Sequence, residues 1–61
     1  MLLNYIEVFE LPLKFTEQQL YDAFYLKVNN IERSNLNERD KIIYVKQLED
    51  LYNKAKLDLH P

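Results

Sequence analysis

The chain has 61 residues, with ten acidic and eight basic side chains and a net charge of −2. This length allows one domain, residues 1–61, and a small core, because so short a chain buries only about 60% of its unfolded surface. The interleaved charges form no basic stripe for nucleic acid, the lack of cysteine excludes disulfides, and no apolar run is long enough to cross a membrane. The absence of glycine favours helices over hairpins. No signal peptide is evident at the N-terminus, so a cytoplasmic location is expected.

The first predicted helix covers Leu2–Glu10. Its apolar residues recur at the i, i+3, i+4, i+7 spacing of one helical face, and they are Leu2, Tyr5, Ile6 and Phe9. Pro12 is expected to end this helix, because proline cannot continue the hydrogen-bond ladder.

The second predicted helix covers Glu17–Ile31. Thr16 fits as its N-cap, and Gln19, three residues later, completes a capping box. The expected inner face consists of Leu20, Ala23, Phe24, Lys27 or Val28, and Ile31.

The third predicted helix covers Asn37–Leu59, with Asn35 or Asn37 as its cap. Its inner stripe is Ile42, Val45, Leu48, Leu51, Tyr52, Ala55 and Leu59. The short connection predicts that the second and third helices lie antiparallel, with the first packed across them. The fold class is therefore all-α, and the residues expected to be buried together are Phe9, Leu20, Phe24, Ile31, Val45, Leu48 and Tyr52.

Two stretches resemble the J-domain (DnaJ-type) family. Residues 4–12 read NYIEVFELP, which resembles the family's opening D-Y-Y-E-V-L-G-V. Residues 16–24 read TEQQLYDAF, which resembles the start of its second helix, S-D-E-E-I-K-K-A-Y, at the same spacing. The form F-x-L-P at residues 9–12 is most similar to the J-domain co-chaperone of iron–sulfur cluster assembly. The resemblance extends over roughly residues 4–61 and implies a three-helix J-domain fold.

The same alignment places the family's His-Pro-Asp signature on residues that do not match it. Without gaps, the signature falls on Glu32, Arg33 and Ser34. In the family this tripeptide lies in the loop between helices two and three and is needed to stimulate ATP hydrolysis by a DnaK-type chaperone. The resemblance therefore implies the fold without this activity.

The family's second helix also presents a basic outer face to the chaperone. Here the corresponding positions hold Tyr21, Asp22 and Tyr25, and Lys27 alone is basic nearby. Both features of the family that engage the chaperone are thus absent from this sequence.

The chain does contain one His-Pro pair, His60-Pro61. In one register the pair follows the third helix, where the cluster-assembly co-chaperone also tends to carry His-Pro, and Pro61 marks the helix end. In a rival register, Leu48 to Pro61 would match the end of a J-domain second helix. The end of the chain at this point is expected either for an excised domain or for a naturally minimal protein.

No arrangement in the sequence predicts catalysis or cofactor binding. His60 is the only histidine, and a single histidine without cysteine partners does not form a convincing zinc site. The acidic pairs Glu7 with Glu10 and Glu49 with Asp50 would need a cleft to act as acid and base, so surface positions are expected for them. Since no nucleophile–base pair or phosphate loop is present, an enzyme is not expected.

Five tyrosines are many for this length. Tyr5 and Tyr52 are expected in the core with the hydroxyl at its rim. Tyr21 and Tyr25 are i, i+4 neighbours on an outer face that Val28 would continue and Tyr44 would widen. Such a row is typical of a protein-binding surface, although helix one or a further region could also cover it.

Two functions follow from this pattern. The first is a non-catalytic J-like interaction module, a chaperone-system adaptor or decoy, which binds another protein chain. A DnaK-type chaperone, a J-protein or a second copy would serve as that partner, with no role for nucleic acid or membrane. The alternative is a degenerate structural domain that packs against a further part of a cluster-assembly co-chaperone.

Overall fold

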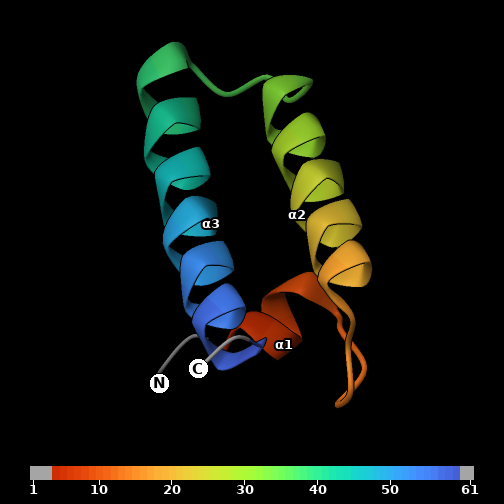
Figure 1. Ribbon diagram of the computed structural model, residues 1–61. Coiled ribbons are helices and arrows are strands. Elements are labelled where there is room, and N and C mark those ends of the chain that lie inside the picture. Colours follow the sequence, from red (N-terminus) through yellow and green to blue (C-terminus); the bar gives the residue numbers. More distant parts are fainter. Residues whose placement is uncertain (1–3, 60–61) are drawn as a thin grey trace.

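Three helices make up the computed structural model, which describes residues 4–59. They are α1 (Tyr5–Phe9), α2 (Glu17–Glu32) and α3 (Glu38–Leu59), and no strand occurs within the described range. The long helices α2 and α3 form an antiparallel hairpin, and α1 lies across its open end (Figure 1). The predicted all-α class and helix order are thus confirmed. None of the helices described is both long and apolar enough to cross a membrane.

The first helix is shorter than predicted at both ends. Asn4 is extended and its side chain accepts a hydrogen bond from the Ile6 N–H at 2.8 Å, so α1 begins at Tyr5. Leu2 lies outside the described residues. At the other end Glu10 adopts a left-handed conformation, with φ 53°. The Leu11 N–H bonds to the Ile6 carbonyl at 2.9 Å and the Glu10 N–H to the Glu7 carbonyl at 3.3 Å, which is a Schellman cap. This cap ends α1 before Pro12 is reached.

The Glu10 cap leads to a prediction about stability. A residue with a Cβ pays a steric penalty in the left-handed region that glycine avoids. Glu10→Gly is therefore expected to raise the free energy of unfolding by roughly 0.5–1 kcal/mol, as measured by urea denaturation. Glu10→Gln is the control, because it keeps the Cβ but removes the exposed ion pair with Lys27 (4.0 Å), which contributes little. A glycine variant less stable than the glutamine variant would contradict this account of the cap.

The capping residues of α2 and α3 are those that local chemistry favours. The Thr16 hydroxyl accepts a hydrogen bond from the Gln19 N–H at 3.1 Å, and the Gln19 side-chain oxygen accepts one from the Thr16 N–H at 2.8 Å. The predicted capping box is confirmed. Asn37 is the cap of α3, since its side-chain oxygen accepts a hydrogen bond from the Asp40 N–H at 2.8 Å. Both long helices therefore begin within one residue of the predicted position.

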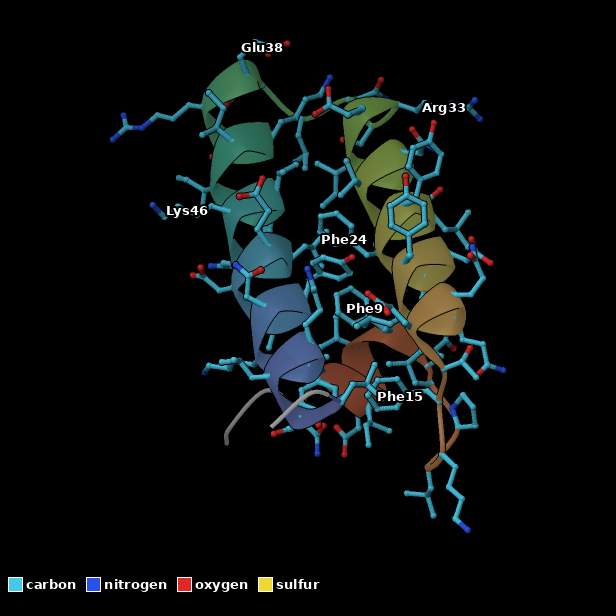
Figure 2. The ribbon with its side chains drawn as sticks, in the orientation of Figure 1. Phe9, Phe15, Phe24, Arg33, Glu38 and Lys46 are labelled. Atoms are coloured by element: carbon cyan, nitrogen blue, oxygen red, sulfur yellow. The ribbon has the colours of Figure 1, made fainter. Side chains whose placement is uncertain are left out.

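The core lies at the end of the hairpin that α1 covers. Its buried residues are Phe9, Leu11, Leu20, Leu48, Leu51 and Ala55. Phe24 packs edge-on against Phe9 at 6.3 Å and stacks on Tyr52 at 4.5 Å, both measured between ring centroids. Figure 2 shows Phe9 and Phe24 pointing into the space between α2 and α3. These rings join all three helices.

Burial is less complete than predicted. Phe24, Ile31 and Tyr52 pack against the core but remain half-buried, and Val45 is also half-buried rather than buried. Ile42, predicted on the inner stripe, is 66% exposed, so that prediction is wrong. The physical reason is the length of α1, which has five residues and covers only one end of the hairpin.

Tyr5 links α1 to the last turns of α3. Its hydroxyl donates a hydrogen bond to the Asp58 carboxylate, and its ring meets the edge of Phe15 at 5.8 Å. The hydrogen bond to Asp58 raises the pKa of Tyr5 above its usual value. Tyr5 is half-buried, with its ring against the core and its hydroxyl at the rim, as the sequence predicted. His60 and Pro61 lie outside the described residues.

Candidate functional site

Tyr21 and Tyr25 form a stacked aromatic pair on the outside of α2. Their ring centroids are 6.2 Å apart with an angle of 22° between the planes. The i, i+4 spacing places both rings on one face, and they are 49% and 56% exposed. About half of each ring thus faces solvent.

Val28 and Tyr44 occupy different surroundings from this pair. Val28 is half-buried and packs against the core, because a residue three positions after Tyr25 lies about 60° back toward the Phe24 row. The expectation that Val28 continues the exposed row is therefore wrong. Tyr44 is exposed on α3, but it precedes Tyr52 by eight residues, or about 12 Å of helix axis. Because Tyr52 stacks on Phe24, Tyr44 lies well beyond the level of Tyr25.

A hollow of about 420 Å³ lies between the N-terminal turns of α2 and the facing side of α3. It is lined by Glu17, Gln18, Tyr21 and Tyr52. The Lys56 ammonium lies over the Tyr52 ring, 5.5 Å from its centroid. The hollow therefore has two aromatic walls and a carboxylate at its edge.

The face of α2 around the tyrosine pair is acidic. The helix carries Glu17, Asp22 and Glu32 but only one cation, Lys27. Lys27 is directed toward α1, where its ammonium lies 4.0 Å from the Glu10 carboxylate. Asp22 is held by the Gln18 side chain, whose Nε2 donates to Oδ1 at 2.9 Å. The charge of this face is thus opposite to the one that the J-domain resemblance implies.

The end of α2 is closed by Glu32, Arg33 and Ser34, the residues that the J-domain resemblance aligns with the His-Pro-Asp signature. Glu32 is the last helical residue, and the Arg33 N–H bonds to the Asn29 carbonyl at 3.0 Å. The Ser34 hydroxyl donates to the Ile31 carbonyl at 2.6 Å. The Arg33 side chain extends away from the hairpin (Figure 2). The backbone and hydroxyl groups of this segment therefore serve as a helix cap.

The Lys41 side chain holds the connection between the helices from the other side. Its ammonium donates to the Glu32 carbonyl at 2.9 Å, across the turn between α2 and α3. The Ser34 hydroxyl in turn accepts a hydrogen bond from the Leu36 N–H at 3.4 Å. Side-chain contacts with the backbone thus hold the part of the connection that follows α2.

Sequence reasoning named Tyr44 as exposed but missed the wider apolar region at the start of α3 to which it belongs. Ile42, Ile43 and Tyr44 all expose large apolar side chains there. Together with Val45 they form four consecutive apolar residues, which surround the helix, whereas α2 meets it on one side only. Four consecutive apolar residues cover more of the helix surface than one amphipathic stripe. This run is visible in the sequence and could have indicated the exposed region.

A second hollow, of about 370 Å³, adjoins this region. Its lining residues are Glu32, Ile42, Val45, Lys46, Glu49 and Asp50. Glu49 and Asp50 thus share a surface depression with a lysine and two apolar side chains. Across residues 4–59, no group of three or more His, Cys, Asp or Glu side chains is placed to hold a metal ion.

Comparison with known proteins does not identify a family for this chain, so its function is inferred from the side chains described above. No protein-family model matches the sequence, and no curated protein or solved structure matches it significantly.

Proposed function

We propose that this chain is a non-catalytic, J-domain-like interaction module that binds a partner protein through Tyr21 and Tyr25. The observation that carries the proposal is the stacking of two half-exposed aromatic rings on an outer helix face. Burial of apolar surface stabilises a protein by roughly 25 cal/mol per Å². An exposed ring lacks this stabilisation, and a partner that covers the ring provides it. Tyrosine is also enriched among the residues that dominate binding energy at protein interfaces.

Two features support the J-like part of the proposal. The helix order and the antiparallel hairpin are those that the resemblance implies. The quoted J-domain opening has glycine where this chain has Glu10. Among the residues that the structure describes, Glu10 is the one with a positive φ, a conformation that favours glycine. A glycine-type backbone at the glycine position of the motif is a local agreement that hydrophobic spacing alone would not produce.

The module is expected not to stimulate a DnaK-type ATPase. Its Glu32, Arg33 and Ser34 lack the imidazole ring, the fixed φ and the carboxylate that His-Pro-Asp supplies in that order. A steady-state assay with the purified chain and such a chaperone should give the basal rate of ATP hydrolysis. Stimulation of several fold that is lost in Arg33→Ala would contradict this part of the proposal. If the rate stays at the basal value, as expected, the role that remains for the chain in a chaperone system is that of an adaptor or decoy.

The binding face is tested with Tyr21→Glu combined with Tyr25→Glu. This variant should keep its helical circular dichroism, because neither ring is in the core, and should lose partner retention from a lysate of the source organism. The matched control is Leu26→Glu combined with Leu57→Glu, two exposed leucines outside this face, which should retain the partner. If sedimentation shows a monomer before and after the change and both variants retain the same proteins, the proposed face is an ordinary surface.

The exposed run Ile42, Ile43 and Tyr44 favours a second candidate function, a structural domain that another part of a longer protein covers. The two candidates differ in which change abolishes the contact. The structural domain requires Ile42→Glu with Ile43→Glu to abolish it, while Tyr21→Glu with Tyr25→Glu leaves it intact. The interaction module requires the reverse.

A further inference from the structure

We propose that α3 associates with α3 of a second copy of this chain, in antiparallel orientation, through a stripe of residues in its N-terminal half. The stripe consists of Arg39, Ile42, Lys46 and Glu49, and all four side chains are exposed. This contact lies on α3, so it does not depend on the proposed binding face of α2.

The stripe is a face of α3 that the core does not use. Its residues follow one another at intervals of three, four and three, which keeps them along one side of a helix. The core uses another face of α3, on which Leu48, Leu51 and Ala55 are buried. Ile42 is 66% exposed, so a contact that covers it gains the burial of a large apolar side chain.

The charged members of the stripe have no partner among the described residues. Across residues 4–59, Arg39, Lys46 and Glu49 make neither an ion pair nor a side-chain hydrogen bond. Arg39 and Glu49 cannot reach each other within one chain, because ten residues separate them by about 15 Å along the helix axis. Only a contact between two copies can pair the Arg39 guanidinium with the Glu49 carboxylate.

A two-fold axis at the level of Tyr44 brings these charges together. In a symmetric antiparallel pair, residues at equal distances on either side of the axis lie opposite each other. Arg39 and Glu49 are each five residues from position 44, so they face each other twice in the dimer. Ile42 and Lys46 are each two residues from it, so Ile42 packs against the aliphatic stem of Lys46 of the second copy. The stripe is thus complementary to itself, which favours a second copy as the occupant.

The hollow of about 370 Å³ beside the stripe has the charge to receive this arginine. Three carboxylates line it, from Glu32, Glu49 and Asp50, against one ammonium, from Lys46. Its charge is therefore negative, and a guanidinium that enters it can form two in-plane hydrogen bonds with a carboxylate. Because polar residues in such a seam fix its register at a cost in stability, the dimer is expected to be weak.

The test is sedimentation equilibrium of the purified full chain at concentrations from about 10 µM to 1 mM, where the parent should dimerise reversibly. Arg39→Glu and Glu49→Arg should each weaken dimerisation at least about fivefold, because each places two like-charge pairs in the dimer. An equimolar mixture of the two variants should dimerise to within about twofold of the parent, since both pairs are then attractive again. Lys54→Glu, exposed on α3 outside the stripe, is the control for the change of charge and should dimerise like the parent.

Three results overturn the proposal. These are a parent that stays monomeric over this range, single variants that dimerise as tightly as the parent, and a mixture no tighter than either variant alone. Tyr21→Glu with Tyr25→Glu should dimerise like the parent. If that variant is monomeric instead, self-association belongs to α2 and the stripe on α3 is excluded.

Discussion

Leu20→Ala is expected to leave most of the chain unfolded at room temperature. Leu20 is the largest side chain that is fully enclosed among the described residues, with 0% exposure. Truncation of a buried leucine costs about 3–5 kcal/mol, from lost transfer energy and the cavity that remains. The core of a domain of this size rarely supplies more than about 3–5 kcal/mol of stability, so the loss removes nearly all of it. Helical circular dichroism and urea denaturation measure the effect.

The control for this prediction is Leu26→Ala. Leu26 lies in the same helix but is 60% exposed, so its truncation should change the free energy of unfolding by less than about 0.5 kcal/mol. Similar stabilities for the two variants would contradict the assignment of Leu20 to the centre of the core.

Phe24→Ala is expected to have the second large effect. The Phe24 ring contacts Phe9 on α1 and Tyr52 on α3. Its removal therefore eliminates contacts of α2 with both other helices. Loss of a core phenylalanine costs about 3–5 kcal/mol, and the half-buried position of Phe24 places it near the lower value. Thermal unfolding should become broad or shift far below that of the parent.

Tyr25→Ala provides the comparison for Phe24→Ala. It removes a neighbouring aromatic ring of similar size that packs outside the core, and should change the thermal midpoint little. A cooperative transition of Phe24→Ala close to that of the parent would show that the aromatic contacts do not hold the hairpin together.

The features that local chemistry determines could be predicted from the sequence. Thr16 and Gln19 lie three residues apart and satisfy each other's backbone groups, so the start of α2 depends on no distant residue. The end of α1 was predicted less well. Pro12 gave the stronger signal, whereas the Schellman cap at Glu10 requires a left-handed non-glycine residue, which sequence rules do not favour.

The extent of burial could not be predicted, because it depends on how far α1 reaches. Ile42 has the helical spacing of a core residue, but the five-residue α1 ends too soon to cover it. Periodicity shows which residues share a face and does not show whether another element meets that face.

The candidate site was predicted in part for the same reason. The i, i+4 spacing of Tyr21 and Tyr25 was sufficient to place both rings on one face of α2. The hollow beside them also needs Tyr52, whose position depends on the register between α2 and α3. That register is set by tertiary contacts such as the stacking of Phe24 on Tyr52.

The connection between α2 and α3 is held by hydrogen bonds that its own residues make. Arg33 and Ser34 end α2 through backbone and hydroxyl hydrogen bonds, and Lys41 secures the Glu32 carbonyl from α3. These contacts stabilise the connection without a His-Pro-Asp sequence. The hydrogen bonds of the segment itself are therefore sufficient to explain how it joins the two helices.

The most direct test of the central claim is photo-cross-linking in the source organism. A benzoylphenylalanine replaces Tyr21 or Tyr25, and in separate controls it replaces Ile43 or Leu57, which are also exposed but lie on α3. The interaction module predicts one discrete cross-linked species from positions 21 and 25 and none from 57. A cross-link from Ile43 alone would assign the contact to the structural-domain alternative. Equal cross-linking from all four positions, or none from 21 and 25, would contradict the proposal that this face of α2 binds a partner.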